Sequence, residues 1–222
     1  MMIRIEGRSI QGTRLIGSRR TYAGAELVSS KLTSCVLAQF DDPNFGLVVR
    51  DTLVQECIVD RCQVQGVYFE NLTVDGLDAK QIHRIYGCVF DRVVLKGKIG
   101  PVMVMPPHVG LVDRERHVAG MMEKYREVEW ALDISEASFV DADFYCVPGD
   151  LIKYDPETQV LLRREKFEGV ATGDLPTYAG IWVSRFSGTP FDSLVAVAPK
   201  RSKSFSKYML DIEWLHAQGL AG

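Results

Sequence analysis

The sequence predicts a mainly β protein whose chain winds into a solenoid, and a five-residue repeat is the main reason. Every fifth position of one stretch carries a small or branched residue, namely Thr52, Cys57, Cys62, Val67, Leu72 and Leu77. A second apolar set follows two positions later and comprises Val54, Val59, Val64, Phe69, Val74 and Ala79. An α-helix repeats about every 3.6 residues and a strand about every 2, so neither explains this spacing. A chain that turns a corner every five residues does explain it, with both sets pointing inward.

The repeat continues on both sides of this stretch. Before it, a small residue stands two positions ahead of a leucine at 25–27, 30–32 and 35–37, and the register slips near residue 50. The polar residues 41–44 mark a corner or an insertion. After the main stretch the spacing runs to residue 82, slips by one, and resumes at the pairs Cys88/Phe90 and Val93/Leu95.

The clearest repeats are Ala-Ser-Phe-Val-Asp at 137–141 and Ala-Asp-Phe-Tyr-Cys at 142–146. These units resemble the A-(D/N)-(L/F) triplets of pentapeptide-repeat proteins, and the resemblance covers residues 20–100 and 131–149. It implies a right-handed parallel β-helix in which four five-residue units form one square coil. The inward small position would be held by Ala137, Ala142, Cys57 and Cys62. The central position would be held by Leu27, Leu32, Phe69, Phe139 and Phe144.

Two segments lie outside the repeat. Apolar residues at steps of three and four between Leu111 and Leu132 predict an amphipathic helix. The last third gives strand signals near 151–154, 159–164 and 193–198, and helix signals from 174 to 187 and from Ser202 or Ser204 to Gly219. Because the ends of stacked strands expose unpaired edges, these segments are expected to cover them. The predicted organisation is a solenoid over 1–149 with a helical insertion at about 108–131, and a C-terminal α/β appendage over 150–222 that caps it.

Composition narrows the classes of protein to consider. The formal net charge of −3 gives no general attraction to nucleic acid or to an anionic membrane. No apolar run is long enough to span a membrane, and the N-terminus lacks the apolar core of a signal peptide. We therefore expect a cytoplasmic, bacterial protein without a membrane partner. The odd number of cysteines, five, fits a reducing compartment. Four of them stand at inward positions, which predicts core packing for Cys35, Cys57, Cys62 and Cys88.

Few residues point to chemistry. The four histidines belong to no metal-binding or catalytic motif, so we expect no enzymatic activity, no metal and no cofactor. His117 follows charged residues on the expected helix and is predicted to lie in solvent. His83 is predicted to occupy an outward position of the solenoid.

One local feature is unusual, a basic cluster around the start of the last helix. It consists of Lys200, Arg201, Lys203, Ser204 and Lys207. Cations are mildly unfavourable at a helix N-terminus, whereas an anion is favoured there. The cluster is thus a candidate site for a phosphate, a carboxylate or an acidic partner. A solvated turn whose lysines point away is the alternative that we favour, because salt screening makes the penalty small.

The expected function is non-catalytic binding of another protein, whose identity the sequence does not reveal. Solenoids present wide, rigid surfaces, as an immunity or scaffold protein requires. The candidate interface residues are Tyr68, Tyr86, Tyr145 and Trp182, because tyrosine and tryptophan are enriched at interfaces. Some of these four are instead expected to pack the C-terminal appendage onto the solenoid. A homodimer formed through the helix at 204–218 is a further alternative.

Two other functions stay open. Some pentapeptide-repeat proteins mimic DNA and bind DNA gyrase, and residues 51–78 hold six acids against one base. Positions twenty apart, however, set Asp60 against Lys80 and Asp78 against Lys98, which favours pairing between coils over a DNA-like line of acids. Direct binding of nucleic acid is not expected. The other alternative is an enzyme with its site between the solenoid and the C-terminal unit, which no motif supports.

Overall fold

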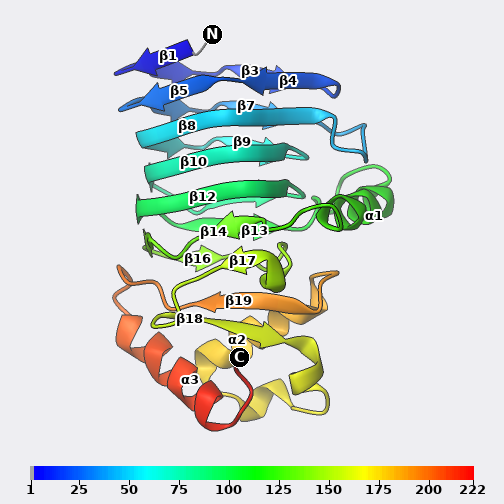
Figure 1. The fold of residues 1–222 in the computed structure, drawn as a ribbon, viewed down its shortest axis with the longest axis vertical. Coiled ribbons are helices and arrows are strands. Elements are labelled where there is room, and N and C mark those ends of the chain that lie inside the picture. The colour runs from blue at the N-terminus through cyan, green and yellow to red at the C-terminus, as the bar shows by residue number, and fades with distance from the viewer. Residues whose placement is uncertain (1–2) are drawn as a thin grey trace.

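The protein is built mostly from parallel strands stacked along its long axis (Figure 1). The structure, a computed structural model, describes residues 3–222. Strands hold 42% of the chain and helices 21%, so β structure dominates. The first strand lies at one end of the stack, and the C-terminal helices lie at the other. Within the described residues no helix is both long and apolar enough to cross a membrane.

The larger sheet has eleven strands, all paired in parallel. Its main order is β1-β5-β8-β10-β12-β14-β17, and the other members pair at its side. The eleven strands are β1 (Ile3–Glu6), β2 (Ser9–Gln11), β4 (Arg20–Ala23), β5 (Ala25–Val28), β6 (Lys31–Thr33), β8 (Leu47–Asp60), β10 (Tyr68–Ala79), β12 (Val89–Ile99), β14 (Leu132–Asp133), β15 (Ala137–Phe139) and β17 (Ile152–Lys153).

The second sheet has six short strands in the order β16-β13-β11-β9-β7-β3, again all parallel. Its members are β3 (Arg14–Ile16), β7 (Val36–Ala38), β9 (Gln63–Gln65), β11 (His83–Tyr86), β13 (Val102–Met105) and β16 (Ala142–Asp143). Side chains from both sheets meet in one apolar core, which includes Leu47, Val67, Val104 and Phe144.

The predicted fold class, a right-handed β-helix made of square coils, is wrong. The strands form separate parallel sheets and not a closed solenoid. Strands β8, β10 and β12 run on for 14, 12 and 11 residues, where five-residue sides would have ended. The pairing distance also varies: Thr52 pairs with Leu72, twenty positions on, whereas Leu47 pairs with Arg20, twenty-seven positions back.

The five-residue period still has a local cause. Left-handed backbone, with φ between 50° and 79°, recurs at Asp51, Glu56, Arg61, Gly66, Asn71 and Gly76. Each such residue bends the chain, so side chains at equal distances from a bend point the same way. Glycine and asparagine tolerate this conformation best, whereas aspartate, glutamate and arginine adopt it at some cost. A regular bend within long parallel strands therefore explains the pattern.

Helix α1 (Arg114–Tyr125) lies beside the strands at the level of β12 and β14 (Figure 1). Its buried residues His117, Met121 and Tyr125 share one face, and the Tyr125 hydroxyl donates to the Cys88 carbonyl at 3.3 Å. Gly120 is required because a Cβ there would lie 1.9 Å from the Pro43 carbonyl oxygen. The helix occupies the middle of the stretch 111–132, where the sequence predicts one.

The C-terminal unit has its own apolar core around a two-stranded antiparallel sheet. The sheet pairs β18 (Gln159–Arg163) with β19 (Ser193–Val197), and α2 (Thr177–Ser184) and α3 (Phe205–Ala217) pack on it. Single 3₁₀ turns at Gly149–Leu151, Arg164–Phe167, Thr172–Asp174 and Arg185–Ser187 complete the unit. The strand expected near 151–154 is β17, which joins the larger sheet by pairing with β14 instead of with β18.

The five cysteines are free thiols. Cys57 and Cys88 are buried, which confirms core packing for these two, whereas Cys35 and Cys62 are half-buried. Cys146 is buried as well. Burial raises the pKa of the Cys88 thiol to about 12, so it stays protonated and unreactive.

Candidate functional site

The basic cluster is partly used to hold the C-terminal unit in place. The Lys200 ammonium lies 2.9 Å from an oxygen of Asp155. Arg201 donates from its guanidinium to the Ile99 carbonyl at 3.3 Å, and from its backbone N–H to Phe139 at 2.9 Å. Lys203 and Lys207 are exposed and have no ion pair among the described residues, and Ser204 makes no side-chain capping bond. The cluster therefore does not converge on one anion site.

Two of the four candidate interface aromatics, Tyr145 and Trp182, are buried at the junction with the C-terminal unit. The Arg185 guanidinium lies 5.1 Å from the Tyr145 ring and donates to Asp143 at 2.7 Å. Burial raises the pKa of Asp143, and the Arg185 charge opposes that rise. Trp182 packs near the Tyr208 ring at 5.9 Å. Both side chains are buried within the chain, as the sequence predicts for some of these aromatics, and neither is an exposed anchor.

The other two aromatics, Tyr68 and Tyr86, are half-buried and belong to different sheets. The Tyr68 hydroxyl donates to Asp91 at 3.1 Å, and its pKa is raised chiefly by burial. Tyr86 meets the edge of the His108 ring at 5.2 Å. Neither lies against the other, so the structure does not combine the four into one surface.

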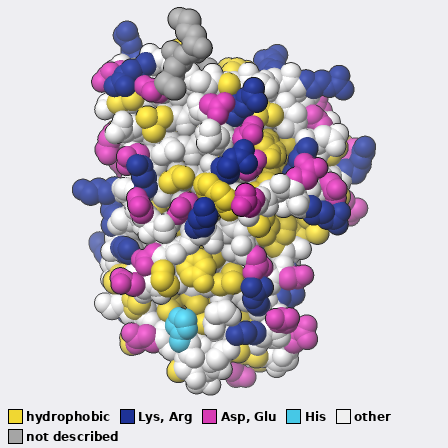
Figure 2. Space-filling view, in the orientation of Figure 1, with side chains coloured by type: hydrophobic (Ala, Val, Ile, Leu, Met, Phe, Trp, Pro, Cys, Tyr) yellow, Lys and Arg dark blue, Asp and Glu magenta, His cyan; other side chains and the backbone are white. Residues whose placement is uncertain are grey.

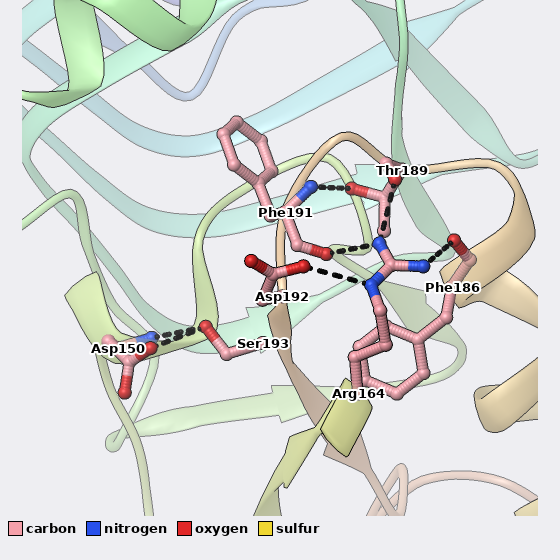
Figure 3. A network of polar contacts seen from close by, with 7 residues as sticks. All are labelled: Asp150, Arg164, Phe186, Thr189, Phe191, Asp192 and Ser193. Atoms are coloured by element: carbon pink, nitrogen blue, oxygen red, sulfur yellow. Dashed lines mark hydrogen bonds and ion pairs between the residues drawn. The ribbon is translucent and has the colours of Figure 1, made fainter. Parts of the chain in front are cut away.

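The densest polar network belongs to the C-terminal unit and is structural (Figure 3). Arg164 donates to Asp192 at 2.9 Å and to three backbone carbonyls, those of Phe186, Thr189 and Phe191, at 2.7–3.1 Å. The Ser193 hydroxyl donates to Asp150 at 2.6 Å. This pair lacks a base, since no described histidine lies within 4 Å of a carboxylate. No cluster of metal-ligand type occurs in residues 3–222.

A different feature has the properties of a recognition site, a pocket of about 270 Å³ between α1 and the loop that joins β7 to β8. We call it the α1 pocket. The loop contributes Phe40, Asp41 and Pro43, and the helix end contributes Val112, Asp113, Arg116 and His117.

The wall of the α1 pocket contains a buried polar atom without a partner. His117 is only 4% exposed, and its Nδ1 lies 3.2 Å from the Asp113 carbonyl oxygen. Its Nε2 has no hydrogen-bond partner within residues 3–222. A proton on Nδ1 satisfies the carbonyl and leaves Nε2 as an acceptor without a donor. Buried polar atoms are nearly always paired, and this atom, which exposes less than 1 Å² of surface, is an unsatisfied acceptor in a residue that lines the pocket. The prediction that His117 lies in solvent is wrong.

The rim of the α1 pocket is apolar and exposed. Val112, which keeps 78% of its surface accessible, and the exposed Phe40 both line the pocket. Within the pocket, Asp41 and Asp113 outnumber Arg116, which lies 3.9 Å from Asp113. The local charge therefore favours a donor or a cation over an anion.

The loop side of the pocket is held rigidly by a buried amide. Gln39 donates to the carbonyls of Asp42 and Gly66 at 2.8 and 3.0 Å, and it accepts from the Asp41 and Asp42 N–H groups. Asp42 in turn accepts from the N–H of Asn44 and of Gly46 at 2.9 and 3.1 Å. The loop side of the pocket is thus ordered by its own hydrogen bonds.

The sequence marks residues 41–44 only as a corner. The overlooked signal is the spacing of His117, Met121 and Tyr125, which places the histidine on the buried face of the helix.

Figure 2 shows one face of the molecule, on which basic and acidic side chains are interspersed and apolar side chains form patches between them. Pairs such as Arg92–Glu70 at 3.0 Å and Lys96–Asp75 at 3.6 Å join neighbouring strands. Searches against protein-family models, curated proteins and solved structures find no match.

Proposed function

We propose that the protein is a non-catalytic, protein-binding protein of the cytoplasm whose partner docks on the α1 pocket and its rim. The observation that carries this proposal is the unpartnered Nε2 of the buried His117. The exposed Phe40 and Val112 supply an apolar contact area around it.

The size of the pocket favours a side chain of a larger partner over a free metabolite. Small-molecule sites usually enclose about 300–1,000 Å³, and the α1 pocket holds about 270 Å³. Nε2 exposes less than 1 Å² of surface, so a lysine, arginine or amide side chain would donate to it once the His117 ring turns toward the pocket. The neighbours of that side chain would cover the apolar rim. Buried anchors surrounded by weaker contacts are the usual pattern of interface hot spots.

The test compares capture of partners from a lysate of the host by the tagged wild-type protein and by variants. Val112→Lys removes an apolar side chain from the rim of the pocket and adds a positive charge that repels a cationic side chain of the partner. Because Val112 is exposed, this substitution should leave the folding of the protein unaffected. Leu210→Lys on α3 is the matched control, since Leu210 is also an exposed apolar residue. We expect a protein that the wild type and the control retain and that Val112→Lys loses.

A second variant tests the polar contact by itself. His117→Leu removes the acceptor, and the Asp113 carbonyl keeps the backbone N–H groups of residues 116 and 117 as donors, so the melting temperature should not fall. Affinity for the captured protein should fall by about tenfold, the usual worth of one buried hydrogen bond. Capture that is unaffected by both variants, or equally reduced by Leu210→Lys, would contradict the proposal.

No specific observation favours the gyrase-binding alternative, because charges of both signs are paired between neighbouring strands. The resemblance to pentapeptide-repeat proteins and the homodimer through α3 stay predictions. Sedimentation of the purified protein tests the dimer.

A further inference from the structure

The stack of strands has one covered end and one open end (Figure 1). At the covered end the C-terminal unit bonds to the last strands. There the Gln159 amide donates to the Ile134 carbonyl at 3.2 Å, and the Arg201 N–H donates to the Phe139 carbonyl at 2.9 Å. At the other end β1, β2 and β3 each pair with one strand only within residues 3–222. We call these three strands, residues 3–16, the open end.

Backbone groups of the open end face away from the stack. The N–H groups of Ile3 and Gly7 donate to carbonyls of the next level of strands at 2.8 and 3.0 Å. Since the backbone groups of a parallel strand alternate in direction, those of Arg4 and Glu6 point to the open side. The same alternation applies to β2 and β3. A strand edge of this kind is a template on which another strand can pair.

The open end has room for a further level of strands. A Cβ added to Gly7 or Gly12 would meet no described atom within 4 Å. Inside the stack, a Cβ added to the left-handed Gly66 would lie 2.8 Å from the carbonyl oxygen of Gln39, which belongs to the preceding level. The space that a preceding level would occupy is therefore empty at the open end.

The apolar side chains of the open end are incompletely covered. Ile5, Ile10 and Leu15 stand in register with leucines of the next level, and all three are half-buried. Ile3 keeps 59% of its surface accessible. An added strand with apolar side chains at alternate positions would cover this surface.

Positive charge surrounds the open end. Arg8 and Arg14 are exposed and have no ion pair among the described residues, whereas Arg4 pairs with Glu6 and Glu26 at 3.0 and 3.1 Å. Residues 3–24 hold five arginines against a single acid, and basic side chains stand on both sides of this end in Figure 2. A second copy of the chain would bring the same charge to the edge and be repelled, whereas an acidic partner would be attracted.

We propose that the open end binds an acidic, extended segment of another protein, which pairs with the free edge as an added strand. The backbone of the segment supplies both the donors and the acceptors that the edge lacks. Nucleic acid would attract the arginines but offers its phosphates only as acceptors. The open end and the α1 pocket share no residue, so this inference does not depend on the function proposed for that pocket.

A labelled heptapeptide of alternating glutamate and valine, Glu-Val-Glu-Val-Glu-Val-Glu, tests the inference by fluorescence anisotropy. As a strand it presents valines to the apolar side chains and glutamates to the arginines. We expect it to bind, and the corresponding lysine–valine heptapeptide not to bind. The glutamate–valine peptide with a methyl group on every backbone nitrogen should not bind either, because it keeps its side chains but cannot pair as a strand.

A pair of double variants tests the place of binding. Arg8→Glu with Arg14→Glu should weaken the acidic peptide by at least about tenfold, because two attractions become repulsions. Lys203→Glu with Lys207→Glu is the matched control. These two lysines are also exposed without an ion pair among the described residues, their reversal changes the net charge equally, and they belong to the C-terminal unit at the covered end. The control should leave the affinity unchanged.

Absence of binding by the acidic peptide, equal binding of its methylated form, or equal weakening by the two double variants would overturn the inference. Two further measurements address other occupants of the open end. Sedimentation that shows a wild-type dimer dissociated by the peptide would assign the edge to a second copy. A thymidine oligonucleotide that binds more tightly than the peptide, and is lost with Arg8→Glu and Arg14→Glu, would assign it to nucleic acid. Either result would overturn the inference as well.

Discussion

The strand stack and the C-terminal unit fill their interiors differently. Between the sheets Val54 and Val64 leave a cavity, whereas in the C-terminal unit Leu162 and Leu215 are fully buried. Aromatic side chains close the second core, where the Tyr178 and Tyr208 rings stack with centroids 3.7 Å apart. In paired parallel sheets the backbone fixes the spacing, so side-chain size alone decides whether the space is filled. Helices that pack on a small sheet can move closer until their side chains touch.

The largest expected effect is in the tightly packed region. Leu162→Ala should lower the free energy of unfolding by about 3 kcal/mol. The reason is that the buried side chains around Leu162 are packed in place and cannot move into the cavity that the substitution leaves. Urea denaturation followed by circular dichroism measures this loss. A loss below about 1 kcal/mol would mean that the C-terminal core is as loosely filled as the stack.

The next effect concerns the network of Figure 3. Arg164→Met keeps the apolar stem but leaves the carbonyls of Phe186, Thr189 and Phe191 without their donor. We expect about 2 kcal/mol of destabilisation, the usual loss for hydrogen bonds from a charged group. In this variant, the backbone amides of residues 186–192 should exchange their hydrogens faster than the backbone amides of the strand stack. Uniform exchange across the chain would contradict a local role.

The stack should respond to acid through His83. In the unfolded chain its pKa is about 6.5, whereas burial lowers the pKa to about 4 in the folded protein. Between these values only the unfolded state binds the proton, so stability is full above pH 6.5 and falls as the pH drops toward 4. The loss is about 2 kcal/mol after allowing for partial solvent access. Chemical denaturation across this range should show the loss in the wild type and a smaller one in His83→Leu.

The smallest effect is expected at the cavity wall. Val54→Ala should cost about 1 kcal/mol or less, because the side chain already lacks neighbours on one side. Val54→Leu should be neutral or stabilising, since the extra methylene enters empty space. Thermal melting of the two variants beside Leu162→Ala checks the contrast. A large loss from Val54→Leu would show that the site is filled.

The sequence reveals local geometry better than the grouping of strands. The period from Thr52 to Ala79 reflects bends at residues such as Asp51 and Glu56, which are properties of the chain itself. Which strands share a sheet depends on long-range pairing, such as Leu47 with Arg20, that no local pattern encodes. The repeat therefore pointed to a solenoid that the structure does not form.

The candidate site was harder to foresee, because burial depends on distant segments. His117 follows three charged residues and looks solvated, but the loop around Pro43 covers it. Trp182 and Tyr145 look like surface anchors, but the C-terminal unit folds over them. His83, predicted to point outward, lines the cavity instead.

Xenon binding tests most directly the contrast between a hollow stack and a packed C-terminal unit. Crystals pressurised with xenon should show the gas between the sheets, next to Val54 and Val64, and none in the C-terminal core. In the doubly filled variant, Val54→Leu with Val64→Leu, that density should disappear. Xenon absent from the wild-type stack, or present in the C-terminal core, would contradict the account.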